Sequence, residues 1–129
     1  MMGKRILIID DEKDVLLLLE KRLAAEGYSV ITANNGYDAV NLAQSELPDL
    51  IILDLAMPGM GGEVVAEKLK GNSLTRDIPI IFLTVLFPKR KGEEQGAVIA
   101  GHVFIAKPFD PVELLTEVEK LIQTSKETV

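Results

Sequence analysis

Three carboxylates stand directly after two apolar runs of this 129-residue chain. Asp10 and Asp11 follow residues 6–9, and Asp54 follows residues 50–53. If the two runs are neighbouring strands, the carboxylates converge on one small volume, where their mutual repulsion favours a shared cation. Oxygen ligands without a nearby histidine or cysteine favour a hard ion, so the sequence predicts a Mg²⁺ site.

A hydroxyl and an ammonium follow two further apolar runs. Thr84 comes after residues 79–83, and Lys107 comes shortly after residues 103–105. A carboxylate nucleophile, a divalent metal, a hydroxyl and an ammonium together can accept a phosphoryl group and stabilise its equatorial oxygens. The residue types therefore predict phosphoryl transfer to a carboxylate.

Each of these residues also has a simpler structural explanation when it is taken alone. Acids before a helix, such as Asp10 and Asp11, are favoured by the helix dipole and by capping. Asp54 alone fits a turn, and Lys107 alone fits a solvated surface. The functional interpretation depends on all of these residues lying at strand ends of one fold.

The elements that would position these residues alternate between strand and helix. Five short runs rich in Ile, Leu or Val have strand length, namely residues 5–9, 28–33, 50–53, 79–83 and 103–105. Helical spacing of apolar residues occurs in residues 14–25, 36–45 and 62–70. Gly27 is expected to end the first helix, and Asn35-Gly36 is expected to open the second. Asp110, which is followed by proline and then by an acid, is expected to begin the last one.

This alternation predicts a parallel sheet with helices on both faces. Central strands of such a sheet are buried on both sides, so the uniformly apolar runs 6–9, 50–53 and 80–83 belong inside it. The predicted fold is therefore a flavodoxin-like doubly wound α/β fold with a five-stranded parallel sheet of order 2-1-3-4-5, and the second and fifth strands form its edges. The carboxylates after the first and third runs then flank the point where the strand order reverses, which is where such sheets bind ligands.

The composition is typical of a single globular domain, which we expect to cover residues 1–129. Hydrophobic residues make up 47% of the chain and charged residues 26%, which excludes a disordered chain. The net charge of -6 disfavours direct nucleic-acid binding, because that affinity depends on neutralising phosphates with Lys and Arg. The chain has no cysteine, and no apolar run is long enough for a signal peptide or a membrane span. We therefore expect a cytoplasmic protein without a membrane partner.

The site residues stand in motifs whose order resembles that of one signalling family. The motifs are Asp10-Asp11-Glu12, Asp54-Leu55-Ala56-Met57-Pro58, Thr84 and Lys107-Pro108-Phe109. Together they resemble the receiver domain of two-component response regulators, the CheY-like family, and the resemblance covers essentially the whole chain.

The resemblance implies a metal role for four residues. Asp54 would accept the phosphoryl group and, with Asp11, would bind Mg²⁺ directly. Asp10 would act mainly through water, and the main-chain carbonyl of Ala56 would supply a further oxygen.

Three other matching positions would act on the phosphoryl group or respond to it. Lys107 and Thr84 would contact the phosphoryl oxygens. Phe104 stands where the family has a switch aromatic, which turns inward as the threonine moves, although a plain core role fits this residue equally well.

The resemblance also implies partners. The phosphoryl donor would be a phosphohistidine on a sensor histidine kinase or on a histidine phosphotransfer protein. A downstream protein would bind the face formed by the fourth helix, the fifth strand and the fifth helix. The chain would then be a signalling phosphoacceptor, with self-catalysed phosphoryl transfer and hydrolysis only, and not an enzyme acting on an outside substrate.

Three local features depart from the family pattern. Gly61 replaces an acid and makes residues 59–62 rich in glycine. Ala56 and Leu86 flank the site with apolar side chains that position no water, which predicts a long-lived phosphorylated state. Glycines within residues 87–103 disfavour a helix by about 1 kcal/mol each, so we expect the fourth helix to be short, shifted or mobile.

Two other functions fit part of the pattern. A metal-dependent phosphatase with an aspartate nucleophile needs an acid two residues after that aspartate, but Ala56 stands there. A degenerate receiver that only binds partners would be expected to have lost part of the five-residue site set, which is intact.

Overall fold

The apolar runs of the sequence form the strands of one sheet. The computed structural model describes residues 3–85, 96–99 and 102–127, and the side chains of residues 96–99 and 124–127 are not among the described groups. In chain order the elements are β1 (Arg5–Ile9), α1 (Lys13–Ala25), β2 (Ser29–Ala33), α2 (Gly36–Glu46), β3 (Leu50–Asp54), α3 (Gly62–Lys70), β4 (Ile80–Thr84), β5 (Gly96–Ile99), β6 (His102–Ala106) and α4 (Pro111–Glu127).

The predicted order of the parallel strands is confirmed. The sheet has the order β2-β1-β3-β4-β6-β5, and its first five strands are parallel. All residues of β3 and β4 are buried, and so is β1 beyond Arg5, as expected for strands covered on both faces. The reversal of strand order between β1 and β3 therefore lies where the sequence placed it.

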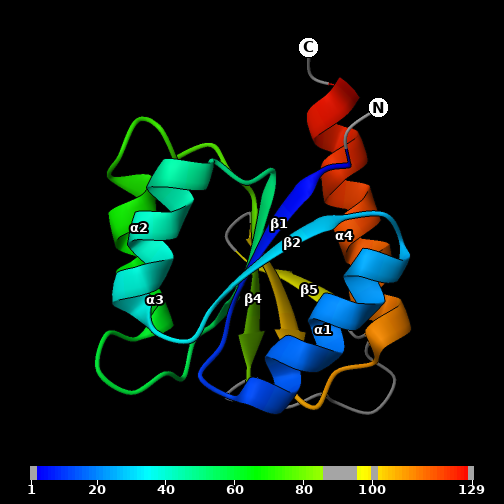
Figure 1. The fold of residues 1–129 in the computed structure, drawn as a ribbon, viewed down its shortest axis with the longest axis horizontal. Helices are drawn as coiled ribbons and strands as arrows, with labels where there is room; N and C mark the ends of the chain where they lie inside the picture. The colour runs from blue at the N-terminus through cyan, green and yellow to red at the C-terminus, as the bar shows by residue number, and fades with distance from the viewer. Residues whose placement is uncertain (1–2, 86–95, 100–101, 128–129) are drawn as a thin grey trace.

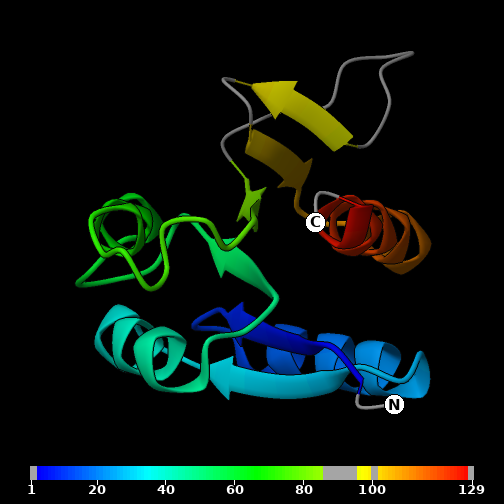
Figure 2. The same cartoon turned by 90° about the horizontal axis from the view of Figure 1, so that it is seen from above.

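The far edge of the sheet differs from the prediction. Gly96–Ile99 forms β5, which pairs antiparallel with β6 and lies beyond it at the end of the sheet (Figure 2). The expectation that the last parallel strand forms an edge is wrong, and these four residues are not part of a fourth helix. Their β-branched valine and isoleucine favour an extended chain, and the open edge of β6 offers it main-chain partners. The rest of the expected helix, and Leu86, lie outside the described residues.

Helices cover both faces of the sheet. α1 and α4 lie on one face and α2 and α3 on the other (Figure 1). Successive residues of β1 alternate between the two layers, because neighbouring side chains of a strand point to opposite faces. Ile6 and Ile8 pack with Leu19 of α1, whereas Leu7 and Ile9 pack on the α2 and α3 side. Each such fully buried side chain contributes about 1.5–3 kcal/mol, so the carboxyl end of β1 is firmly held.

The helix ends follow the predicted signals. The Asn35 Oδ1 accepts a 2.9 Å hydrogen bond from the Asp38 N–H at the start of α2. The Asp110 Oδ1 accepts one of 2.9 Å from the Val112 N–H at the start of α4. Gly27 follows α1 with a φ of 93°, which confirms it as the residue that ends this helix. No helix in the described ranges is long and apolar enough to span a membrane.

Candidate functional site

The carboxylates at the carboxyl ends of β1 and β3 meet at one point at the edge of the sheet. Ile9 and Leu53 are register partners in the two parallel strands, so the residues that follow them, Asp10 and Asp54, emerge side by side. Asp10 is fully buried and Asp54 is 2% exposed, whereas Asp11 is exposed. One carboxylate oxygen from each of these three aspartates lies within 4.8 Å of the others. The structure thus brings together the acidic cluster that the sequence predicted.

The two buried aspartates are oriented by the main chain in the same way. The Asp10 Oδ1 accepts a 2.9 Å hydrogen bond from the Glu12 N–H. The Asp54 Oδ1 accepts a 3.1 Å hydrogen bond from the Ala56 N–H. Each bond engages one carboxylate oxygen in a local turn, which is the usual behaviour of aspartate at the end of a strand. The second oxygen, Oδ2, remains available on each side chain for other contacts.

Lys107 enters the cluster from the end of β6. Its main-chain N–H donates to the Thr84 carbonyl oxygen at 2.9 Å, which ties the ends of β6 and β4 together. Its ammonium nitrogen lies 2.9 Å from the Asp10 Oδ2 and 3.4 Å from the Asp54 Oδ2. The Lys107 side chain is only 9% exposed, so these charges interact with little screening by water.

Burial and charge shift two of these groups in the same direction. Burial raises the pKa of the Asp10 carboxyl, and the repulsion from Asp54 adds to the shift, while the Glu12 N–H and the Lys107 ammonium oppose it. Burial would lower the pKa of Lys107, but its contacts with Asp10, Glu12 and Asp54 outweigh this effect and raise it. Lys107 is therefore charged at neutral pH, and a buried cluster richer in negative than in positive charge remains around it.

The cluster has the properties of a site for a hard divalent cation. Its potential ligands are all carboxylate oxygens, which Mg²⁺ and Ca²⁺ prefer. The Asp10 Oδ2 is buried and contacts the Lys107 ammonium at 2.9 Å, and the described residues offer it no second donor. Buried carboxylate oxygens are normally hydrogen-bonded or bound to metal, so this oxygen fits a role at the edge of a metal site.

Of the remaining predicted site residues, Thr84 and Ala56 lie beside the cluster, whereas Phe104 lies further back along β6. Thr84 ends β4, is 2% exposed and is the register partner of Ala106, so it stands beside Lys107. Ala56 is exposed, two residues beyond Asp54. Phe104 is half-buried on β6, and its ring stacks on Phe82 with the ring centres 5.0 Å apart.

The glycine-rich segment after Asp54 allows the chain to pass close to the site. Gly59 has a φ of 75°, which only glycine adopts without strain. A Cβ atom on Gly62 would lie 2.4 Å from the Asp54 carbonyl oxygen and 2.6 Å from the Leu55 Cα. The first turn of α3 therefore packs directly against the main chain that carries Asp54.

Sequence reasoning did not predict the role of Glu12. It treated this acid only as part of a motif, but the Glu12 Oε1 accepts a 3.1 Å hydrogen bond from the Lys107 ammonium, 95 residues along the chain. The only signal was a third acid after two others, and nothing in the sequence says which way its side chain points.

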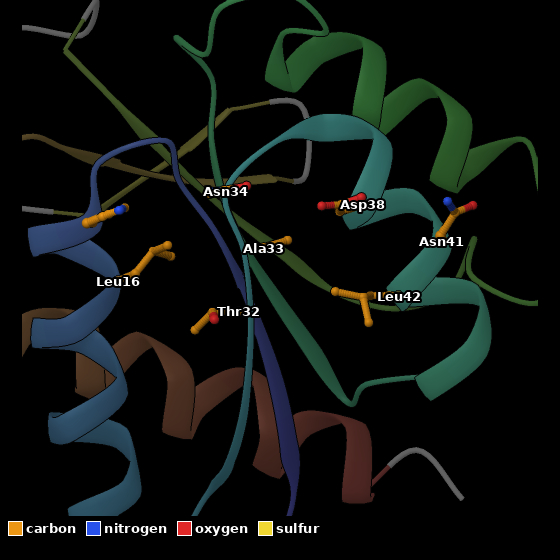
Figure 3. A pocket seen from close by; sticks show the side chains of 8 residues that line it. Leu16, Thr32, Ala33, Asn34, Asp38, Asn41 and Leu42 are labelled. Carbon is orange, nitrogen blue, oxygen red and sulfur yellow. The ribbon is translucent and has the colours of Figure 1, made fainter.

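Two hollows lined by described residues lie near this end of the molecule, and one of these two borders the site. The larger, of about 600 Å³, lies between α1 and α2 over β2 (Figure 3). It is lined by Lys13, Leu16, Thr32, Ala33, Asn34, Asp38, Asn41 and Leu42, and so contains none of the clustered carboxylates. A hollow of about 360 Å³ borders Lys107 and Glu12, and apolar side chains such as Leu18 and Val85 line the rest of it. This smaller hollow gives access to the ammonium side of the cluster.

Comparison with known proteins agrees with this geometry. The family model described as "Response regulator receiver domain" matches residues 6–119. The chain is 42% identical to the response regulator PleD of Caulobacter vibrioides over 120 residues, which cover 93% of this chain and 26% of PleD. It is 38% identical to the alkaline phosphatase synthesis transcriptional regulatory protein PhoP of Bacillus subtilis, over 97% of this chain and 51% of PhoP.

The fold also matches that of solved structures. The chemotaxis protein CheY4 of Vibrio cholerae superposes with a TM-score of 0.78 at 28% identity, over 92% of this chain and 98% of that one. The chain spans about a quarter of PleD and about half of PhoP. The family model covers nearly all of the strands and helices, and the matched range contains the acidic cluster and Lys107. The chain therefore belongs to the response regulator receiver domains, a family of signalling phosphoacceptors.

Proposed function

We propose that residues 1–129 form a single receiver domain that accepts a phosphoryl group on Asp54 from a phosphohistidine. The observation that carries this proposal is the position of the Asp54 carboxylate, which lies inside a three-carboxylate cluster and 3.4 Å from the Lys107 ammonium. The phosphohistidine would belong to a sensor histidine kinase or a histidine phosphotransfer protein, and the exchange would take place in the cytoplasm.

The transfer needs a nucleophile that remains ionised and in position. An Asp54 carboxylate oxygen attacks the phosphorus and forms a C–O–P bond, while the P–N bond of the donor breaks and its electron pair stays with the imidazole. The hydrogen bond from the Ala56 N–H to Oδ1 holds the carboxylate in one orientation. Oδ2 is therefore the oxygen that we assign as nucleophile.

The charge on the transferred group has to be balanced by the surrounding residues. Lys107 carries a full positive charge at neutral pH and lies beside Asp54, so it can bind one phosphoryl oxygen. Thr84, at the end of the neighbouring strand, would donate a hydrogen bond from its hydroxyl to another phosphoryl oxygen. Asp10, Asp11, Asp54 and the main-chain carbonyl of Ala56 would hold Mg²⁺, which when bound neutralises charge on the reacting oxygens.

The output of the domain would depend on the strand ends that the site shares. The Thr84 carbonyl is bonded to the Lys107 N–H, so a movement of Thr84 towards a phosphoryl group reaches β6 directly. Phe104 lies on β6 with its ring against Phe82, on the side of the sheet that α2 and α3 cover, so a change of ring position would alter the packing on that side. We assign Phe104 as the switch residue, and we assign β6 and α4, the described part of the expected output surface, to binding of a downstream protein.

The proposal is tested by labelling with a small acyl-phosphate donor. Acetyl phosphate with Mg²⁺ should add one phosphoryl group to the chain, measured as a mass increase in an intact-protein spectrum. Omitting Mg²⁺ or replacing Asp54 by Asn should abolish the increase. Equal labelling of the wild type and the Asp54→Asn variant would show that the acceptor is another residue.

A further inference from the structure

The position of Glu12 suggests a helix cap or a metal ligand, but its side chain has neither role. It is the N-terminal cap residue of α1, but its side chain makes no capping hydrogen bond. It follows Asp10 and Asp11, but it is not part of the carboxylate cluster that can hold a metal. Instead its Oε1 accepts a hydrogen bond from the Lys107 ammonium at 3.1 Å.

The three carboxylates around Lys107 differ in their surroundings. The side chains of Asp10 and Asp54 are 0% and 3% exposed, and their carboxylates belong to the cluster, whereas the Glu12 side chain is 61% exposed and its carboxylate lies outside the cluster. A cation bound in the cluster would therefore offset the charge of Asp10 and Asp54 directly, but not that of Glu12. Glu12 is then the strongest remaining competitor for the ammonium.

A phosphoryl group on Asp54 also needs this ammonium. Lys107 has three N–H donors, and its ammonium nitrogen lies 2.9 Å from an oxygen of Asp10, 3.1 Å from one of Glu12 and 3.4 Å from one of Asp54. The longest of these contacts is the one to Asp54, so the ammonium is held nearer to Asp10 and Glu12 than to the proposed acceptor. To reach a phosphoryl oxygen, the Lys107 side chain has to give up part of its contact with Glu12.

We propose that Glu12 is a positioning residue that holds the Lys107 ammonium away from Asp54 and so lowers the affinity of the site for a phosphoryl group. This inference rests on the proposed function of Asp54. Its size follows from the exposure of Glu12, because ion pairs with one solvated partner change an equilibrium by up to about fivefold. We expect replacement of Glu12 by Gln to tighten binding of a phosphoryl group by about threefold.

Beryllofluoride, a non-covalent mimic of the phosphoryl group, allows this affinity to be measured at equilibrium. Isothermal titration calorimetry with saturating Mg²⁺ would give the dissociation constant for the wild type, Glu12→Gln, Lys107→Gln and the double variant. The expected result is tighter binding on Glu12→Gln in the wild-type background and no change in the Lys107→Gln background. The double-mutant cycle separates the Glu12–Lys107 contact from a general effect of charge.

Asp14→Asn is the matched control, because Asp14 is an exposed acid on the first turn of α1 and lines the same hollow as Glu12 and Lys107. It should leave beryllofluoride affinity unchanged, and a Mg²⁺ titration without beryllofluoride should give similar affinities for Glu12→Gln and Asp14→Asn. Weaker or unchanged binding by Glu12→Gln, equal tightening by Asp14→Asn, or tightening that persists without Lys107 would each overturn the inference. If the wild type itself binds beryllofluoride no better than Asp54→Asn does, the proposed function fails instead.

Discussion

Replacing Gly62 by Ala should damage both the stability of the domain and its metal site. A Cβ atom there would lie 2.4 Å from the Asp54 carbonyl oxygen, about 1 Å inside the 3.4 Å at which ordinary contact begins. The neighbouring atoms are main chain of a buried strand end and cannot rotate away, so α3 or the Asp54 backbone has to shift. Overpacking of this kind destabilises by about 1–3 kcal/mol, and for a domain of this size 2 kcal/mol lowers Tm by about 6–10 °C.

The same displacement should weaken metal binding. Mg²⁺ requires near-ideal ligand positions, and displacing residues that orient metal ligands typically weakens metal binding by about 10–100-fold. Scanning calorimetry would measure the stability of Gly62→Ala, and a Mg²⁺ titration followed by NMR amide shifts would measure its metal affinity. We expect a loss of at least about tenfold in Mg²⁺ affinity.

Gly61→Ala is the matched control for this experiment. Gly61 precedes α3 with a φ of -69°, which any residue adopts, and a Cβ atom on it would be 3.7 Å from its nearest neighbour, the Leu55 carbonyl oxygen. This variant should differ from the wild type by less than about 0.5 kcal/mol. Equal Tm values for the two alanine variants would refute the packing argument, and a destabilised Gly62→Ala with unchanged Mg²⁺ affinity would show that α3 moves while Asp54 stays in place.

Three further predictions follow from the same structure. Asp10→Asn should raise Tm at pH 7 in metal-free buffer, because burial makes ionised Asp10 unfavourable in the folded state. The gain in Tm should vanish as the pH falls towards the ordinary aspartate pKa of 3.8, and a gain independent of pH would contradict this. Gly27→Ala should lower stability by about 1 kcal/mol through its positive φ and leave Mg²⁺ affinity unchanged, which calorimetry and a metal titration can check together. The phosphoryl group on Asp54 should be long-lived, since Ala56 offers no group to position a hydrolytic water; loss of the added mass within seconds after removal of the donor would contradict this.

The raised pKa of Asp10 has a consequence for metal binding. The folded domain keeps a buried carboxylate whose ionisation opposes stability, and this cost falls when a cation shares the charge. Metal binding and stability should therefore be linked, since a ligand that binds only the folded state stabilises it by mass action. The buried Asp10 carboxylate therefore favours binding of a cation, and it lowers the stability of the metal-free domain.

Most of the fold could be predicted from local patterns in the sequence. The uniform apolar runs predicted the buried strands β1, β3 and β4, because a strand covered on both faces has no position for a polar side chain. Asn35, Asp110 and Gly27 predicted helix ends, because each satisfies main-chain groups or a backbone angle within a few residues. These features depend only on neighbours along the chain, and so the sequence carries them directly.

The strand order, once predicted, also placed the carboxylates. Asp10, Asp11 and Asp54 follow strands that had to be adjacent, so their convergence required no knowledge of side-chain geometry. The resemblance to receiver domains added specific roles to these positions, and the family is confirmed.

Long-range contacts were decided by the tertiary structure alone. The glycines of residues 87–103 argued against a regular helix, and in the described part of that segment residues 96–99 form β5. This strand exists because the open edge of β6 accepts a further strand, which no local pattern reveals. The glycine-rich turn was recognised in the sequence, but only the packing of α3 against Asp54 shows that Gly62, and not Gly61, has no room for a side chain.

The sequence by itself determined the parallel strands, most helix ends, the order of the parallel sheet and the identity of the clustered acids, because periodicity and capping are local properties. The tertiary structure decided which carboxylates contact Lys107. It placed the Glu12 side chain against this lysine instead of at the start of α1 or in the metal site. The physical reason is that a long side chain at the end of a helix can reach several partners of similar strength, and only the position of a lysine 95 residues away selects among them.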